Sequence, residues 1–303
     1  MELYQIRTFL VVAQEQNLTR AAERLALSQP AVSGQIKSLE AEFGSPLFER
    51  GPTGMQLTTA GKALIEPAQA VMSAASSLRA QADGLAGQLM GSLKLGVVLH
   101  PDAIGLAQLV RSLIERHPMV RLDIRHRNTL TIVSSLRSHE LDASFYIGRD
   151  IPADLGFVEL RRIVHRIVAA PAWHDRLRDI SWAGLSQLPW IVTPKGGAFA
   201  QLVDSIFLPR GLQLTHLIEA DQELSIISLV EAGVGISLMR EEVAREAAAR
   251  GAVMTWDGGS TESVLRLLYL RSRENEPLTR ELLRIAGEMG AHNARHPAAP
   301  STP

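Results

Sequence analysis

Apolar side chains recur every three or four residues in three successive runs at the start of the chain. This spacing places them on one side of a helix, so each run predicts an amphipathic helix whose apolar face is buried. The first helix is expected over residues 3–16. The second follows Thr19, whose hydroxyl can cap its free N–H groups. The apolar positions are Leu3, Ile6, Phe9, Leu10 and Ala13, then Ala21, Ala22 and Leu25, then Val32, Ile36, Leu39 and Phe43.

The third helix has the clearest start. Ser28 can serve as its N-cap, and Pro30 falls near its first position, where the missing N–H costs nothing. With the apolar seam buried, the polar side chains left to face outward are Gln29, Ser33, Gln35 and Lys37. Such side chains read base edges and phosphates when a helix lies in the major groove of DNA. An ordinary amphipathic helix pair in a globular protein would give the same pattern.

A hairpin is expected directly after these helices. Residues 47–50 and 55–58 read as two short strands around a turn at residues 51–54. Arg50 and Thr53 then lie where such a wing would reach phosphate or the neighbouring minor groove. On spacing alone, a solvent-exposed hairpin tip is the more ordinary interpretation.

The amino-acid sequence of this region is more informative than the spacing of its apolar residues. Residues 3–50, which contain LYQIRTFL and LTRAAERLALSQPAVSGQIKSLEAEFGSPLFER, closely resemble the winged helix-turn-helix of LysR-type transcriptional regulators. The resemblance implies a sequence-specific DNA-binding regulator, in which helix residues read bases and flanking residues hold phosphates. The residues expected at the DNA are Thr19, Arg20, Gln29, Pro30, Ser33, Gln35, Lys37, Arg50 and Thr53.

A long heptad pattern follows the hairpin. Its apolar positions alternate four and three residues apart, at Leu64, Ala68, Val71, Ala75, Leu78, Ala82, Leu85 and Leu89. Such a seam favours two copies of the helix packing along their length, and the frequent alanines permit a close approach. Residues 59–90 are therefore expected to form a linker helix through which the chain dimerises. A single helix docked on its own domain is the alternative.

From residue 92 the pattern changes to strands that alternate with helices, which predicts a mostly parallel sheet with helices on both faces. Strands are expected at residues 93–98, 120–127, 143–147, 163–169, 190–192, 214–219, 235–239 and 265–270. Helices are expected at residues 101–117, 129–139, 198–207, 224–232, 240–249 and 277–289. The Pro- and Ala-rich end, residues 292–303, is expected to be a disordered tail.

This second arrangement resembles the effector domain of the same regulators, which is similar to periplasmic binding proteins. The expected fold class is α/β with an N-terminal all-α winged helix-turn-helix, a long dimerisation linker helix and a two-subdomain periplasmic-binding-protein-like effector domain. The expected boundaries are residues 1–58, 59–90 and 91–291, with one subdomain at about 91–161 and 267–291 and the other at about 162–266. The two crossings between subdomains would form a hinge. The basic cluster at residues 161–166 is expected to be solvated or subunit-contact surface there.

In such folds small molecules bind beyond the carboxyl ends of the strands, where helix N-termini present free N–H groups. Thr129 and Thr193 could bond a ligand there, and Lys195 could balance an anion. The family often has a small hydroxyl residue after the first strand, where this chain has Leu99 and His100, so a simple carboxylate clamp is in doubt. His100 either contacts the ligand or caps a helix at a solvent-facing turn. The candidate effector-binding residues are Leu99, His100, Asn128, Thr129, Tyr146, Thr193, Lys195 and Phe199, although core packing is the ordinary role of the two aromatic side chains.

Composition sets outer bounds on this interpretation. The 303 residues include 31 Lys and Arg against 32 Asp and Glu, so no overall charge points to nucleic acid, and DNA binding requires cations that cluster on one face or are doubled in a dimer. The absence of cysteine excludes disulfides, cysteinyl zinc sites and thiol catalysis. Neither a signal-peptide pattern nor a membrane span is recognisable, so a cytoplasmic protein with no membrane partner is expected.

No catalytic set stands out, and the glycine-containing stretches lack the spacing of nucleotide-binding loops, so neither an enzyme nor a cofactor is expected. His292 and His296 have a spacing that can bind metal on a helix, but they fall in the predicted tail, and no metal site is expected. The expected partners are double-stranded DNA, further copies of the chain in a homodimer or homotetramer, a small-molecule effector and RNA polymerase. An α/β enzyme, a ligand-transport protein and a sequence-independent architectural DNA binder stay open as alternatives.

Overall fold

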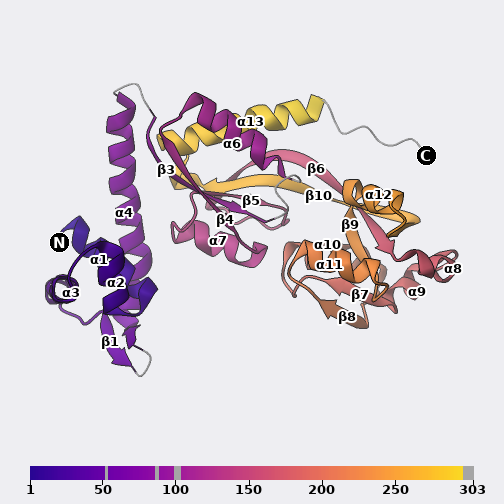
Figure 1. The fold of residues 1–303 in the computed structure, drawn as a ribbon, viewed down its shortest axis with the longest axis horizontal. Coiled ribbons are helices and arrows are strands. Elements are labelled where there is room, and N and C mark those ends of the chain that lie inside the picture. The colour runs from indigo at the N-terminus through magenta and orange to yellow at the C-terminus, as the bar shows by residue number, and fades with distance from the viewer. Residues whose placement is uncertain (52–53, 86–88, 99–103, 296–303) are drawn as a thin grey trace. The chain divides into compact units, whose positions relative to one another are not determined.

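The computed structural model describes residues 1–51, 54–85, 89–98 and 104–295 (Figure 1). The chain divides into two compact units. Unit 1 comprises Met1–Gln88 with Arg137–Glu140, and unit 2 comprises Leu89–Leu136 with Leu141–Pro303.

Unit 1 contains the three predicted helices. They are α1 (Leu3–Glu15), α2 (Leu18–Leu25) and α3 (Gln29–Phe43). Their apolar stripes meet in one core, in which Phe9 and Val32 are fully buried. The ring of Phe9 meets that of Phe48 edge to face, with ring centroids 5.6 Å apart.

The helix starts lie where side chains can cap them. Asn17 caps α2, because its Oδ1 accepts hydrogen bonds from the N–H groups of Thr19 and Arg20 at 2.9 and 3.1 Å. The predicted cap at Thr19 is therefore wrong, and Asn is the stronger N-cap of the two residue types. Ser28 caps α3 as predicted, and its Oγ accepts from the N–H of Ala31 at 3.3 Å.

Phe43 departs from the predicted buried seam of α3. It is 39% exposed, whereas Val32, Ile36 and Leu39 are buried. Phe43 is the last residue of the helix, and Gly44 ends it in the left-handed conformation with φ of 67°. The seam therefore leaves the core one turn before the helix ends.

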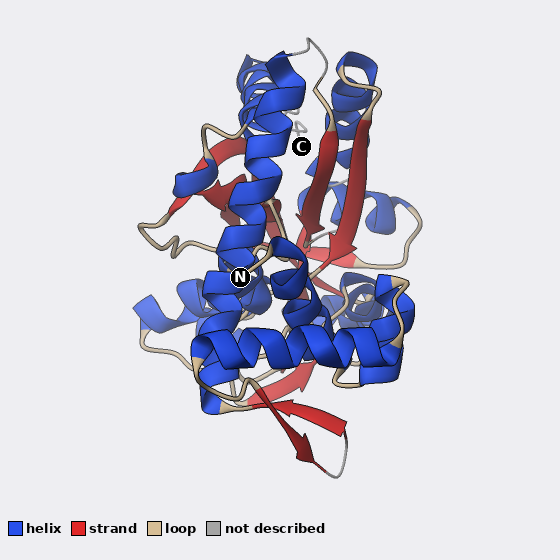
Figure 2. Ribbon diagram, turned by 90° about the vertical axis from the view of Figure 1, so that its left-hand side faces the viewer, coloured by secondary structure: helices blue, strands red, loops and turns tan. Residues whose placement is uncertain are grey.

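The predicted wing is an antiparallel hairpin of β1 (Phe48–Gly51) and β2 (Gly54–Leu57), which Figure 2 shows projecting beyond the helices. It is tied to the turn between α1 and α2, because the N–H of Met55 donates to the carbonyl oxygen of Gln16 at 2.9 Å. Gly54 has φ of 121°, and a Cβ atom there would lie 2.4 Å from the same carbonyl oxygen. Only glycine fits this approach without strain.

Helix α4 (Thr59–Leu85) is the predicted linker helix. Its first heptad positions are already covered, since Leu64 and Ala68 pack against the core of unit 1. The alternative of a helix docked on its own domain thus holds for this end of α4. Further along, Val71 is 37% exposed and Leu78 is 71% exposed, so the seam open to a second copy begins at Val71.

Unit 2 is built on a six-stranded sheet in the order β4-β3-β5-β10-β6-β9 and a separate pair, β7-β8. The strands are β3 (Gly91–Val97), β4 (Val120–His126), β5 (Ala143–Tyr146), β6 (Leu155–Ala169), β7 (Pro189–Val192), β8 (His216–Glu219), β9 (Ser237–Arg240) and β10 (Met254–Leu270). Leu89, the last predicted heptad position, lies outside α4 and packs against the core of unit 2. The linker helix is therefore shorter than predicted.

The large sheet is mixed, and the prediction of a mostly parallel sheet is wrong. Strand β3 is parallel to β4 and β5, whereas β10 is antiparallel to β5 and β6, and β6 is antiparallel to β9. Strand β10, which comes last in the chain, lies between β5 and β6 and is antiparallel to both. Strands β5 and β6 therefore run in the same direction without being neighbours.

Strands β6 and β10 are much longer than predicted and run side by side through both halves of unit 2 (Figure 1). We call β3, β4 and β5 with their helices the first half, and β7, β8 and β9 with theirs the second half. The predicted subdomain boundary falls inside both long strands. Their register shifts there, between Leu265 and Arg266, and such irregularities bend a strand locally.

Helices cover both faces of each half, as predicted. In the first half α6 (Leu106–Arg116) and α13 (Pro277–Arg295) lie on one face and α7 (Thr129–Arg137) on the other. In the second half α10 (Ala198–Phe207) lies on one face, and α11 (Glu223–Glu231) and α12 (Glu241–Ala249) on the other. The short helices α8 (His174–Leu177) and α9 (Trp182–Ser186) join β6 to β7.

Helix α13 continues past its predicted end at Met289 to Arg295, so the prediction of a disordered tail is wrong for residues 292–295. Asn293 helps to hold this last turn, because its Nδ2 donates to the carbonyl oxygen of Leu160 at 3.1 Å. His296 lies outside the described residues. Within the described ranges no helix is long and apolar enough to cross a membrane, and no three His, Cys, Asp or Glu side chains group as metal ligands would.

Candidate functional site

The first candidate surface is the outer side of α2 and α3 in unit 1. The cap at Ser28 and the buried seam of α3 fix which of its side chains face solvent. Of the residues predicted to contact DNA, the structure places Thr19, Arg20, Gln29, Pro30 and Lys37 in exposed positions and Ser33 in a half-buried one. On α3, Gln29, Ser33 and Lys37 are four residues apart in turn, so they lie on one side of that helix.

Gln35 does not belong to this surface. The buried hydroxyl of Thr8 donates to its Oε1 at 2.5 Å, and the side chain of Gln35 is half-buried. Beside it, Nε2 of Gln5 donates to Oγ of Ser38 at 3.0 Å. The prediction that Gln35 faces outward is therefore wrong, since its amide joins α3 to α1.

The remaining predicted contacts lie on α2 and the wing. The Arg20 guanidinium is exposed and donates to the carbonyl oxygen of Glu15 at 2.8 Å. Arg50 belongs to β1 opposite Met55, and Thr53 lies outside the described residues.

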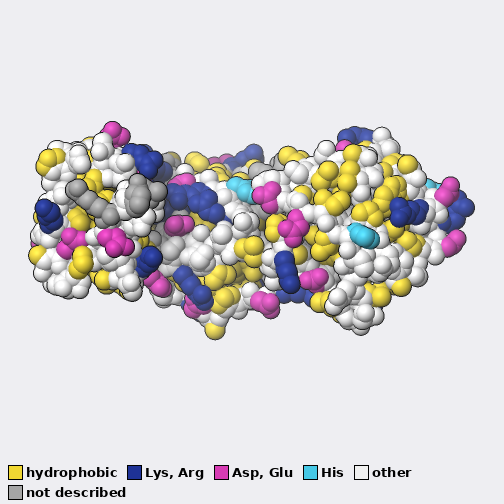
Figure 3. Space-filling model, turned by 90° about the horizontal axis from the view of Figure 1, so that it is seen from below, with side chains coloured by type: hydrophobic (Ala, Val, Ile, Leu, Met, Phe, Trp, Pro, Cys, Tyr) yellow, Lys and Arg dark blue, Asp and Glu magenta, His cyan; other side chains and the backbone are white. Residues whose placement is uncertain are grey.

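Charge is balanced on the part of unit 1 that Figure 3 shows at its left, where Lys and Arg side chains are interspersed with Asp and Glu. A surface of this kind attracts DNA weakly as a whole. Its affinity would depend on where the few cations meet phosphates rather than on their number.

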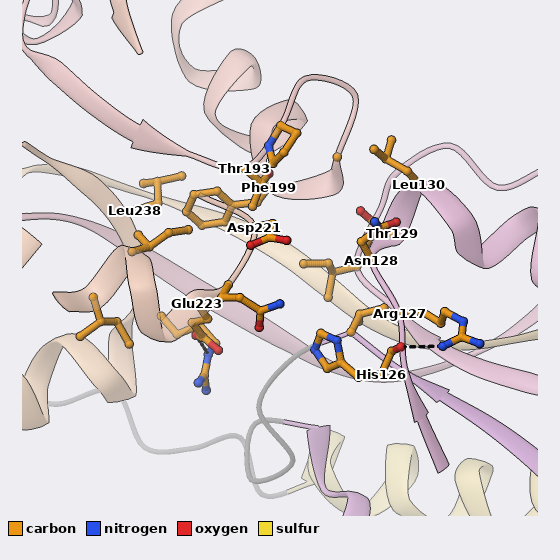
Figure 4. A pocket seen from close by; sticks show the side chains of 18 of the residues that line it. His126, Arg127, Asn128, Thr129, Leu130, Thr193, Phe199, Asp221, Glu223 and Leu238 are labelled. Carbon is orange, nitrogen blue, oxygen red and sulfur yellow. Dashed lines mark hydrogen bonds and ion pairs between the residues drawn. The ribbon is translucent and has the colours of Figure 1, made fainter. Parts of the chain in front are cut away.

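The second candidate site is a pocket of about 440 Å³ in unit 2, lined by both halves (Figure 4). Its walls come from the carboxyl ends of β3, β4, β5, β7 and β8 and from the first turns of α7, α10 and α11. This is where ligands bind in α/β folds, because several helix N-termini converge there. Most of the remaining wall is apolar, including Phe199, Ile227 and Leu238.

The structure brings four of the predicted effector residues together in this wall, namely Asn128, Thr129, Thr193 and Phe199. Lys195 is exposed and does not line the pocket. Tyr146 is only 7% exposed and packs in the core with Ile132 and Leu268, so its predicted place in the cleft is wrong. Leu99 and His100 lie outside the described residues.

The two threonine hydroxyls are occupied by the start of α10. Oγ1 of Thr129 accepts from the N–H of Ala198 at 3.0 Å, and Oγ1 of Thr193 accepts from the N–H of Ala200 at 3.2 Å. Thr129 begins α7 in the first half and Ala198 begins α10 in the second, so the first of these bonds joins the two halves. The N–H groups that were expected to receive an anion are capped by hydroxyls instead.

Sequence reasoning missed the residues at the start of α11. Asp221, Gln222 and Glu223 line the pocket, and so do His126 and Arg127 at the end of β4. The rule used for the other strands would have found them, because they too follow the carboxyl ends of strands.

Three ion pairs lie in the second half, and the residues of the first of them line the pocket. Nε of Arg240 lies 2.9 Å from Oε1 of Glu223. The other two pairs, at 2.7 Å each, are Arg161 with Glu242 and Arg166 with Glu241. Two arginines of the basic cluster that was predicted to be solvated, Arg161 and Arg166, are thus bound to acids of α12, whereas Arg162 is exposed and pairs with Glu262 of β10.

His165 lies buried between these pairs, with only 3% of its surface exposed. Its Nε2 is 2.9 Å from Oγ of Ser263. Burial, followed by the charge of Arg240, lowers the pKa of His165 to about 4, so its imidazole is neutral at neutral pH. It therefore adds a polar atom to the pocket wall without adding charge.

Comparison with known proteins covers both units. Residues 3–62 match the family model described as bacterial regulatory helix-turn-helix protein, lysR family, and residues 86–291 match that of the LysR substrate binding domain. The HTH-type transcriptional regulator IlvR of Caulobacter vibrioides is 30% identical over 299 residues, which cover 96% of this chain and 99% of that protein.

Solved structures share the fold. A full-length OxyR variant from Pseudomonas aeruginosa superposes with a TM-score of 0.72 at 24% identity, over 96% of both chains. Full-length CbnR complexed with its target DNA superposes with a TM-score of 0.66 at 22% identity, over 96% of this chain and 99% of that one.

Proposed function

Because the chain belongs to the LysR family of DNA-binding transcriptional regulators, we propose that α3 reads the DNA sequence and that the pocket of unit 2 holds the controlling small molecule. The observation that carries this proposal is the two-sided character of α3. Val32, Ile36 and Leu39 hold one side in the core, and polar side chains occupy the other. A helix of this kind can enter the major groove without exposing the core.

The roles within the interface follow from side-chain chemistry. Gln29 and Ser33 read base edges, since amide and hydroxyl groups both donate and accept hydrogen bonds. Thr19, Arg20 and Lys37 hold phosphates, and Arg50 and Thr53 do so from the wing. Gln35 acts indirectly, because its bond to Thr8 sets the angle of α3 on α1.

Self-association belongs to the same proposal. The exposed apolar positions of α4, from Val71 to Leu78, pack against those of a second copy. A two-fold dimer presents two recognition helices, so its operator has half-sites about 34 Å apart or a multiple of that distance. Two such dimers would form the tetramer, and contact with RNA polymerase would follow at a promoter in the cytoplasm.

Effector control would act through the two halves of unit 2. A ligand in the pocket touches residues of both halves, and it lies beside the bond between Thr129 and Ala198. Any ligand that favours one arrangement of the halves shifts the population toward it. The register shift in β6 and β10 is a natural place for the bend.

The test is the affinity of the purified protein for duplex from its own upstream region against scrambled duplex, at two salt concentrations. A preference of about a thousandfold or more is expected of a sequence-specific regulator. Equal, strongly salt-dependent binding to both duplexes would contradict the proposal and favour an architectural DNA binder.

A further inference from the structure

The second-half wall of the pocket has one carboxylate more than it has guanidinium groups. The charged side chains of the second half that line the pocket are Asp221, Glu223 and Arg240, and Arg240 is paired with Glu223. Asp221 has no basic partner within the part of the chain that the structure describes. The wall therefore carries one unmatched negative charge.

Asp221 is placed to meet a ligand. Its side chain lines the pocket, and Figure 4 shows it between Phe199 of the second half and Asn128 of the first. The nearest basic wall residue of the first half, Arg127, is turned aside, because its Nη1 donates to the carbonyl oxygen of His126 at 3.0 Å (Figure 4). The negative charge thus faces the cavity while the opposite wall offers no guanidinium aimed at it in this view.

Two further polar atoms of the same wall lack hydrogen-bond partners among the described residues. They are Nδ1 of His165 and Oε2 of Glu223, and both are shielded from solvent. Because both atoms are closed off from solvent, a ligand could reach them only if neighbouring side chains moved.

An anionic ligand would find its usual anchors occupied. The N–H groups of Ala198 and Ala200 at the start of α10 are capped by the two threonine hydroxyls, and Lys195 lies outside the wall. A carboxylate in the pocket would also face the charge of Asp221. This repulsion disfavours an acid.

We propose that the effector of this pocket carries a protonated amine, which faces Asp221, on an apolar body that packs against Phe199. The inference rests on the proposed function, since it names the ligand class of the same regulatory pocket. An ammonium group has three donors and no acceptor, so it can donate charge-assisted hydrogen bonds to the Asp221 carboxylate. Ile227 and Leu238 extend the apolar wall on which the rest of the molecule lies.

The test compares three ligands that share one phenylpropyl body and differ only in the head group: 3-phenylpropylamine, 3-phenylpropan-1-ol and 3-phenylpropanoate. Their dissociation constants are measured by titration calorimetry on the full-length protein at neutral pH. The amine is expected to bind at least about tenfold more tightly than the alcohol, and the acid most weakly.

Variants of Asp221 test whether this carboxylate causes the preference for the amine. Asp221→Asn is expected to remove most of the amine's advantage while leaving the affinity for the alcohol unchanged, and Asp221→Lys is expected to favour the acid. The matched control is Asp204→Asn, which removes an exposed carboxylate of the same half that does not line the pocket, and it should change none of the three constants.

Several outcomes would overturn the inference. They are tighter binding of the acid, absence of amine binding up to millimolar concentration, and an amine-to-alcohol ratio unchanged in Asp221→Asn. If Asp221 only stabilises the start of α11, its variants unfold at lower temperature and the ratio stays the same. Specific DNA binding measured on the same samples separates the two proposals, because a protein that binds its operator but prefers the acid refutes only the amine.

Discussion

Gln29 and Ser33 lie one turn apart on the exposed side of α3 and carry groups that can bond base edges. We expect Gln29→Ala and Ser33→Ala each to weaken binding to the specific duplex by about 1–3 kcal/mol, because each removes a base contact. Binding to random duplex at the same salt should hardly change. Fluorescence anisotropy with both duplexes measures the two affinities.

Gln35→Ala is the matched control on the same helix. Because Gln35 bonds Thr8 inside unit 1, this change should lower the free energy of unfolding by about 1 kcal/mol. Its effect on DNA affinity should be smaller than that of the two outward changes. Unaltered specific affinity in both Gln29→Ala and Ser33→Ala would refute the base-reading role.

Most of the buried apolar positions of unit 1 could be predicted from the sequence, although Leu3 and Phe43 of the predicted apolar faces are exposed. The partners of polar residues could not be predicted. The seam of Val32, Ile36 and Leu39 follows from spacing alone. The bond between Thr8 and Gln35 joins residues 27 apart on two helices, and no periodicity encodes it. Thr19 failed as a cap for a different reason, because Asn17 stood nearby as the stronger candidate.

At the scale of secondary-structure elements, the wing depends on a single close approach. In Gly54→Ala the new Cβ would meet the carbonyl oxygen of Gln16, and the residue would keep a positive φ. We expect the hairpin to shift, with a loss of roughly 1–3 kcal/mol in the free energy of unfolding of unit 1 and weaker DNA binding. Urea denaturation and anisotropy give the two quantities.

Gly44→Ala tests the effect of backbone strain at a positive φ where no steric contact is added. Gly44 also has a positive φ, 67°, but a Cβ atom there meets nothing within 4 Å. It should therefore lose less stability than Gly54→Ala and keep its affinity for DNA. Equal losses in the two variants would show that the approach to Gln16 does not position the wing.

Helices α6 and α13 are joined by a charged cluster whose strength depends on pH. Arg284, helped by His117, holds the pKa of Glu281 at about 2, well below its usual value. A lowered carboxyl pKa adds stability above the ordinary pKa, and this contribution is lost as the pH falls toward 2. The advantage of the wild type over Glu281→Gln in melting temperature should therefore be present at pH 6 and shrink from about pH 4.5 downward. A difference that is the same at pH 6 and pH 3 would contradict this assignment.

The order of the strands and longer helices of unit 2 could be predicted, but the short helices α8 and α9 and the length of the two central strands could not. Strand β10 begins at Met254, well before the predicted start at residue 265, and contains Asp257, Gly258 and Gly259, residue types that favour turns. Pairing with β6 carries the strand across this stretch through a register shift. Tertiary pairing overrides local preference at such a place.

At the scale of the whole molecule, the exposed apolar seam of α4 predicts that the chain dimerises through this helix. Leu78 is 71% exposed, so Leu78→Glu should leave the fold of unit 1 intact while placing a charge in the dimer contact. We expect its dimer dissociation constant to rise by about tenfold or more, and operator affinity to fall with it. Sedimentation velocity at several concentrations measures the association.

Ala70→Glu provides the control, since Ala70 is exposed on α4 but lies off the seam. It should dimerise as the wild type does. A fully dimeric Leu78→Glu would contradict association through this helix.

The position of the pocket could be predicted because strand ends converge there, and Asn128, Thr129, Thr193 and Phe199 follow from that rule. The balance of charges around the pocket could not be predicted. It depends on which arginine pairs with which acid, and Arg161 and Glu242 are 81 residues apart. The bond from Ala198 to Thr129 is equally invisible in the sequence, because it joins the first residues of two separate helices.

The packing of Leu64 and Ala68 into the core of unit 1 also fixes how the regulator can be re-engineered. A chimera that fuses this DNA reader to a foreign sensor at residue 58 would remove part of the reader's own core and leave apolar surface open to water. The junction must lie beyond Ala68, and the donor must supply a helix that continues the heptad phase from Val71. If a fusion joined at the end of the wing is insoluble, the cause would be the position of the junction and not the foreign sensor domain.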